Sequence, residues 1–122
     1  MSTAPQPSAV PQPPAQPEAL RAALAQVAPH LLADFDRDRA ASTARARAEV
    51  SAVPLRTFTE AWAVEVAIAR HPETAARLRA LEDRAGDVDD LGEARVIAAE
   101  ISSIRSAAAT EAGIRTADGA GR

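Results

Sequence analysis

The stretch PLRTFTEAWAVEVAIAR, residues 54–70, carries the richest apolar surface of the chain. One stripe recurs at three- and four-residue spacing and consists of Leu55, Phe58, Trp62, Val66 and Ala69, and it is widened by Ala61, Val64 and Ile68. This spacing places apolar side chains on one face of an α-helix. Because proline suits the first turn of a helix, we expect this helix to begin at Pro54 and to run to Arg70 as the centre of the core.

Prolines also divide the rest of the chain into helices. A short helix is expected behind Pro17, where the apolar residues at helical spacing are Leu20, Ala23, Leu24 and Val27. Pro29 removes a backbone donor and disfavours helical geometry at Ala28, so the pattern predicts a break there and a second helix from Pro29. Pro72 begins another short helix, and we expect Gly86 to stop it in a left-handed conformation.

The last helix is predicted over residues 90–112, behind an acidic linker, and ends near Gly113. Its apolar residues form a narrow seam: Leu91, Ala94, Ile97, Ala98, Ile101, Ile104 and Ala108. Such a seam needs a partner surface. We therefore expect four of its members to bind a partner protein, namely Leu91, Ile97, Ile101 and Ile104, with packing on the chain's own bundle as the alternative. Residues 87–112 hold six acids and two arginines, which favours a basic partner.

Together these patterns predict an all-α protein, with a small bundle of about four helices over residues 18–86 and a longer amphipathic helix within residues 87–113. The Pro-rich residues 1–17 and the small, polar residues 114–122 are expected to be disordered. We expect the core to be anchored by Phe35, Leu55, Phe58 and Trp62. This core is thin, because 32 of the 122 residues are alanine. The domain is therefore expected to be marginally stable alone or to gain stability by association.

The reactive side chains form no catalytic pattern. The absence of cysteine excludes disulfides, thiolate nucleophiles and zinc–cysteine sites. His30 and His71 each lie beside a proline at a predicted helix boundary, and no nucleophile elbow, phosphate loop or dinucleotide-binding turn occurs. We therefore predict a protein that is not an enzyme and takes no cofactor, metal or small-molecule substrate. The lack of a long apolar run and of a basic, apolar start predicts a cytoplasmic protein without a membrane segment.

Residues 34–49 mix carboxylates with arginines. Helical spacing places Asp34 and Asp38 on one face, suited to bridging a cation, but the interleaved arginines predict a solvated face of ion pairs instead. The best basic stretch for a DNA-binding helix consists of Arg37, Arg39, Arg45 and Arg47. The acids of the same stretch leave no local positive excess, so DNA binding is the less favoured function.

Three segments carry a resemblance to a known family: ALRAALAQVAPHLLADFDRD at 19–38, VPLRTFTEAW at 53–62 and ARHPETAARLRALE at 69–82. About half of the chain thereby resembles a family of short actinobacterial helical proteins, a domain of unknown function. Some relatives look like members of toxin and antitoxin pairs. The resemblance implies a helical fold and a small partner protein, and it brings no catalytic residue.

The preferred function is therefore a non-enzymatic protein–protein interaction module, with an antitoxin-like role as its most specific form. Two alternatives stay open. One is a DNA-binding transcriptional regulator that uses the helix over residues 36–47. The other is a structural homodimer in which the last helix pairs with its own copy.

Overall fold

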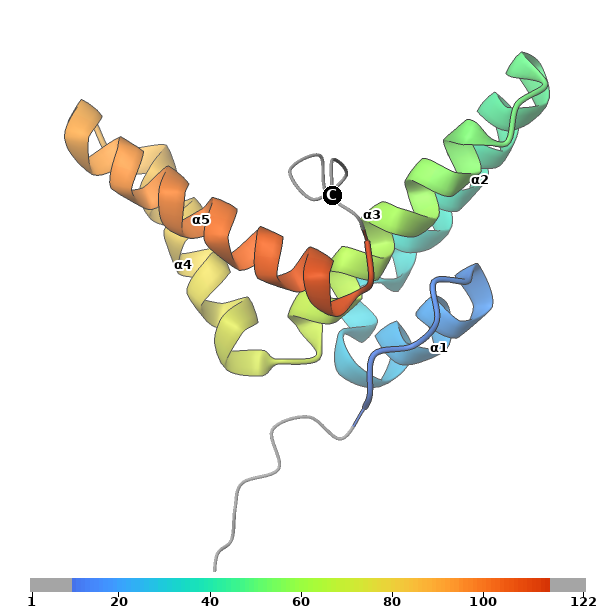
Figure 1. Ribbon diagram of the computed structural model, residues 1–122, viewed down its shortest axis with the longest axis horizontal. Helices are drawn as coiled ribbons and strands as arrows, with labels where there is room; N and C mark the ends of the chain where they lie inside the picture. The colour runs from blue at the N-terminus through green and yellow to red at the C-terminus, as the bar shows by residue number, and fades with distance from the viewer. Residues whose placement is uncertain (1–9, 115–122) are drawn as a thin grey trace, which may run out of the picture.

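The computed structural model describes residues 10–114, and this part of the chain is helical without any strand, which confirms the predicted fold class. The elements are α1 (Pro17–Val27), a single 3-10 turn η1 (Pro29–Leu31), α2 (Leu32–Glu49), α3 (Val53–Ala69), α4 (Pro72–Asp87) and α5 (Leu91–Glu111). Figure 1 shows a V-shaped molecule, with α2 and α3 in one arm and α4 and α5 in the other. The expected tails over residues 1–9 and 115–122 lie outside the described residues.

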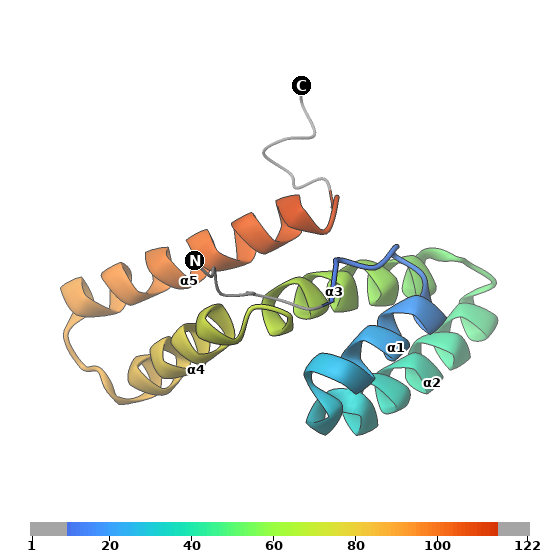
Figure 2. The same ribbon diagram turned by 90° about the horizontal axis from the view of Figure 1, so that it is seen from below.

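Helix α3 lies in the arm with α2 and reaches the base of the other arm, and it contacts each of the other four α-helices. Figure 2 shows α1 and α2 running beside α3, and the larger core lies among these three helices, each of which contributes fully enclosed side chains. There the ring of Phe35 lies 5.1 Å from that of Phe58 and 5.3 Å from that of Trp62, the latter edge-on at 76°. The second core joins the end of α3 to α4 and α5 through Ala67, Ile68, Leu78 and Ala108. The stretch 54–70 is thus the shared wall of two small cores.

The helix boundaries follow from proline and from capping. Pro17, Pro29, Pro54 and Pro72 each lie in the first turn of an element, where a missing backbone N–H costs nothing. The Asp90 carboxylate caps α5 by accepting from the Glu93 N–H at 2.7 Å. Gly113 follows the C-cap residue Ala112 and closes the end of α5 with a φ of 77°; its N–H donates to the Thr110 carbonyl, and the Ile114 N–H donates to the Ala109 carbonyl. These are the two bonds of a Schellman cap.

Three expectations need correction. Gly86 does not stop its helix: α4 continues to Asp87, and Val88 leaves it in an extended conformation. Leu55 does not anchor the core, because 36% of its surface is exposed. It lies in the first turn of α3, at an open surface pocket whose lining also includes Arg39 and Thr43. The other three expected anchors, Phe35, Phe58 and Trp62, are buried.

The third correction concerns residues 10–16, which were expected to be part of a disordered tail. They run as an irregular segment across α3 and are held by side-chain hydrogen bonds. The Gln12 amide donates to the Ala63 carbonyl at 3.1 Å, and the Arg70 guanidinium donates to the Gln12 side chain and to the Val10 carbonyl, each at 3.1 Å. A segment without helical periodicity is therefore ordered by partners about 50 to 60 residues away.

Candidate protein-binding groove

The apolar seam of the last helix is an internal packing surface. Helix α5 folds back beside α4 and onto α3 (Figure 1). Ile97 is 5% exposed, and Ile101 and Ile104 pack, half-buried, against the second core. Of the four residues expected to bind a partner, only Leu91 is left in solvent, with 64% of its surface exposed. Ile97, Ile101 and Ile104 thus pack within the chain, as the alternative expected, and Leu91 is the member of the four that remains open to a partner.

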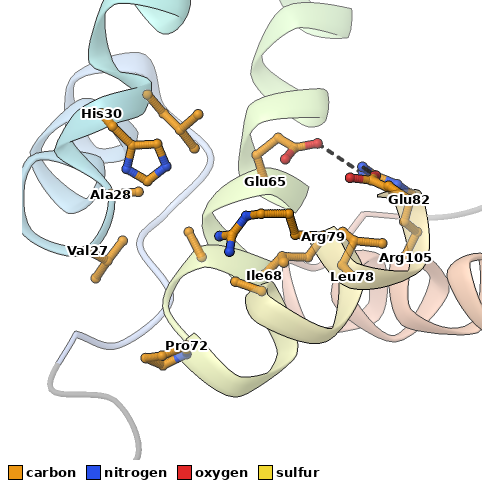
Figure 3. A pocket seen from close by; sticks show the side chains of 13 residues that line it. Val27, Ala28, His30, Glu65, Ile68, Pro72, Leu78, Arg79, Glu82 and Arg105 are labelled. Carbon is orange, nitrogen blue, oxygen red and sulfur yellow. Dashed lines mark hydrogen bonds and ion pairs between the residues drawn. The ribbon is translucent and has the colours of Figure 1, made fainter. Parts of the chain in front are cut away.

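A different apolar surface is open to solvent, in a groove between the end of α1 and the start of α4. These two helices do not contact one another, and α3 forms the floor between them (Figure 3). The groove has a volume of about 350 Å³, and its apolar lining includes Val27, Leu31, Ile68, Ala69 and Leu78. Both walls result from prolines: Pro29 ends α1, and Pro72 turns the chain from α3 into α4. The volume lies within the range of ligand-binding clefts.

An ion-pair network closes one side of the groove. Arg105 of α5 donates to Glu65 of α3 at 3.0 Å and lies 3.5 Å from a carboxylate oxygen of Glu82 of α4 (Figure 3). Partial burial of the guanidinium works against its charge, but the hydrogen bonds and charges of the two glutamates outweigh it, and the pKa of Arg105 is raised. The network ties three helices together and fixes this wall of the groove.

The opposite side of the mouth carries Arg79 and His30, and neither side chain has a carboxylate partner within residues 10–114. Figure 3 shows the Arg79 side chain reaching from α4 into the groove, towards the side of Ala28 and His30. Within residues 10–114, Arg79 makes no ion pair or hydrogen bond. His30 lies at the same mouth, is exposed and has no partner in that range either. An apolar floor with an unpaired arginine above it is suited to an apolar ligand that carries an anionic group.

The arginines of the expected DNA-binding helix are mostly neutralised. Arg37 pairs with Asp34, Arg39 with Glu18 at 2.7 Å and Arg45 with Glu49 at 3.5 Å. In the described part of the chain only Arg47 of this set has no acidic partner. Phosphate binding requires a surplus of positive charge, and α2 does not present one.

The carboxylates Asp34, Asp36 and Asp38 do not converge. Asp34 pairs with Arg37, Asp36 accepts two hydrogen bonds from Arg21 at 2.8 and 2.7 Å, and Asp38 accepts from the Trp62 indole N–H at 3.1 Å. The hydrogen bonds and charge of Arg21 lower the pKa of Asp36, although partial desolvation opposes them. Among the described residues, no three His, Cys, Asp or Glu side chains are grouped so as to hold a metal ion.

Sequence reasoning missed the role of Arg70. Its side chain is 13% exposed and joins three parts of the chain, because besides the segment around Gln12 it pairs with Glu111 at the end of α5. His71 lies 2.9 Å from the same Glu111 carboxylate. No spacing in the sequence signals this arrangement, since its members are about 40 to 60 residues apart.

Over residues 10–114 the chain has no helix with the length and apolar character required to cross a membrane. No family model, no curated protein and no solved structure matches this chain.

Proposed function

We propose that this chain is a non-enzymatic protein-binding module whose groove receives an amphipathic helix of a partner protein. The observation that carries the proposal is the open apolar groove with the unpaired Arg79 at its mouth. Helices α1 and α4 both contact α3 but do not contact each other, and the groove lies between them. Recognition of an amphipathic helix by an apolar groove is a common mode of peptide binding.

The charges of the groove define the partner helix further. Its apolar residues would cover Ile68, Ala69 and Leu78 on the floor, and burial of that surface supplies the main favourable free energy. A glutamate or aspartate of the partner would meet Arg79, with His30 nearby. The Arg105 side of the mouth already has its carboxylates, so it offers no site for a second anion.

The antitoxin-like role is the specific form of this proposal, in which the partner is a small protein encoded by a neighbouring reading frame and the pair acts in the cytoplasm. It rests on the resemblance of residues 19–82 to the helical family described above. The groove supports the broader proposal independently, because it is defined by packing and charge alone. A neighbouring frame with an acidic amphipathic helix in its product is the expected genomic context. This differs from the basic partner expected for docking on the last helix, because that helix packs on α3 and α4 and the groove presents Arg79 instead.

The test is affinity capture with the tagged full chain, followed by titration of the recovered partner with purified chain. The double variant His30→Glu, Arg79→Glu reverses the charge at the mouth of the groove on exposed side chains and leaves both cores intact. Arg47→Glu, an exposed and equally unpaired arginine at the far end of α2, is the matched control. We expect the partner to bind wild type and Arg47→Glu alike and to bind the double variant at least tenfold more weakly.

Equal binding by all three proteins would show that the groove is not the docking site. Recovery of the bait alone would count against the protein-binding function itself. Turnover of a substrate by the purified chain, abolished by one polar substitution, would contradict the non-enzymatic part of the proposal.

A further inference from the structure

The turn between α2 and α3 carries a strained apolar residue in solvent. Val50 has φ 50° and ψ 54°, the left-handed conformation that side chains branched at Cβ rarely adopt, and 90% of its surface is exposed. Glycine would close the same helix end without strain. Val53, three residues on, is 54% exposed. The turn therefore combines two unfavourable features, strain and apolar exposure, that capping alone does not explain, and a contact that buried the two valines would offset the second of them.

This turn is also basic. Residues 45–56, here named the basic tip, contain three arginines and one glutamate. Glu49 forms an ion pair with Arg45 at 3.5 Å. Arg47 and Arg56 are exposed and have no acidic partner within the described part of the chain. The basic tip accordingly presents the exposed side chains of Val50 and Val53 together with two unpaired arginines.

The turn between α4 and α5 has the opposite character. Residues 83–95, here named the acidic tip, contain five acids and two arginines. Arg84 pairs with Glu93, whereas Asp87 and Asp89 make no ion pair in the described range. Two large apolar side chains in the first turns of α5 are exposed, Leu91 at 64% and Val96 at 67%. The acidic tip thus presents the exposed Leu91 beside two unpaired carboxylates. The basic tip presents exposed valines beside two unpaired arginines, so the two tips are complementary in charge and both carry apolar surface.

The two tips are the far ends of the two arms, so they do not meet within one molecule (Figures 1 and 2). We propose that they meet between molecules: the basic tip of one copy docks on the acidic tip of a second copy. Val50 and Val53 would cover Leu91, while Arg47 and Arg56 would pair with Asp87 and Asp89. A second copy is the occupant because this chain itself carries the complement in both apolar surface and charge.

The geometry of this contact sets its properties. Two different surfaces are joined, so each added molecule again exposes one tip of each kind, and the association is head-to-tail. Only a few side chains of each tip would take part, so the contact would be weak and dependent on concentration. Its charges are exposed, so salt weakens it. The groove lies between the end of α1 and the start of α4, away from both tips, and takes no part, which makes this association independent of the proposed function.

Sedimentation velocity over a dilution series tests the proposal on the full chain. One variant reverses the basic tip, Arg47→Glu with Arg56→Glu, and another reverses the acidic tip, Asp87→Arg with Asp89→Arg. All four positions are exposed and unpaired, so both variants are expected to fold as wild type does, which circular dichroism checks. Wild type is expected to associate at low salt and each variant to stay monomeric. An equimolar mixture of the two variants restores opposite charges and is expected to associate.

The Val50→Gly variant separates docking from folding. It relieves strain in the monomer, and it removes the exposed apolar side chain, so association is expected to weaken about tenfold while the monomer becomes no less stable. The Arg79→Glu variant changes charge in the groove, away from both tips, and is expected to associate as wild type does. A monomeric wild type at low salt across the series, a mixture that stays monomeric, or association unchanged by both reversals would each overturn the proposal.

Discussion

Replacing Val50 by glycine is expected to stabilise the monomer, although it deletes an apolar side chain. A non-glycine residue in the left-handed region costs about 1–2 kcal/mol, and glycine removes that cost. Glycine has more conformational freedom in the unfolded chain, and this entropy lowers the free energy of unfolding by about 0.5–1 kcal/mol. Little burial is lost, because the valine is 90% exposed. The net gain is about 0.5–1 kcal/mol, or a rise in melting temperature of about 2–8 °C for a domain of this size.

Urea denaturation of dilute protein measures this gain, with far-ultraviolet circular dichroism for the helices and the fluorescence of Trp62 for the larger core. Val96→Gly is the matched control: Val96 is also exposed, at 67%, but lies within α5. There glycine is the poorer helix former, and we expect a loss of about 0.5 kcal/mol. A destabilised Val50→Gly protein, or the same sign of change in both variants, would refute the assignment of left-handed strain to Val50.

Three further outcomes are expected. Phe35→Leu should lower the free energy of unfolding by about 1–2 kcal/mol, because Phe35 is fully buried between two rings, whereas Leu55→Ala at a partly exposed site should cost about 1 kcal/mol or less in the same urea titration. Asp38→Ala should cost about 1–3 kcal/mol and shift the Trp62 emission, because the indole N–H loses its acceptor. Hydrogen bonds from Arg77 lower the pKa of Glu100, so this pair stabilises the fold at pH values above the carboxyl's unfolded pKa. Denaturation at several pH values compares wild type with Glu100→Gln. The difference between their free energies of unfolding should disappear as the pH falls through the lowered pKa.

The candidate site shows where sequence reasoning stops. Pro29 and Pro72 mark the breaks that build the two walls of the groove, and both breaks were predicted. That the two walls face each other across α3 was not predicted, because they are about 40 residues apart in sequence. The acceptor for the Trp62 indole was expected in general, but its identity as Asp38 depends on how α2 lies against α3. Arg79 has no distinguishing neighbour in sequence, and only its place above an apolar floor gives it a role.

The sequence by itself determined the helices and most of their ends, since apolar periodicity, proline and capping act over a few residues along the chain. It also determined that α3, with its aromatic stripe, would be central. Only the tertiary structure decided what covers each face: α5 turns its isoleucines onto α3 and α4, Leu55 is left in solvent, and Arg70 orders the segment around Gln12. The physical reason is that the hydrophobic effect is non-directional. An apolar stripe in the sequence therefore predicts that one face of a helix is buried, but it does not predict which other surface covers that face.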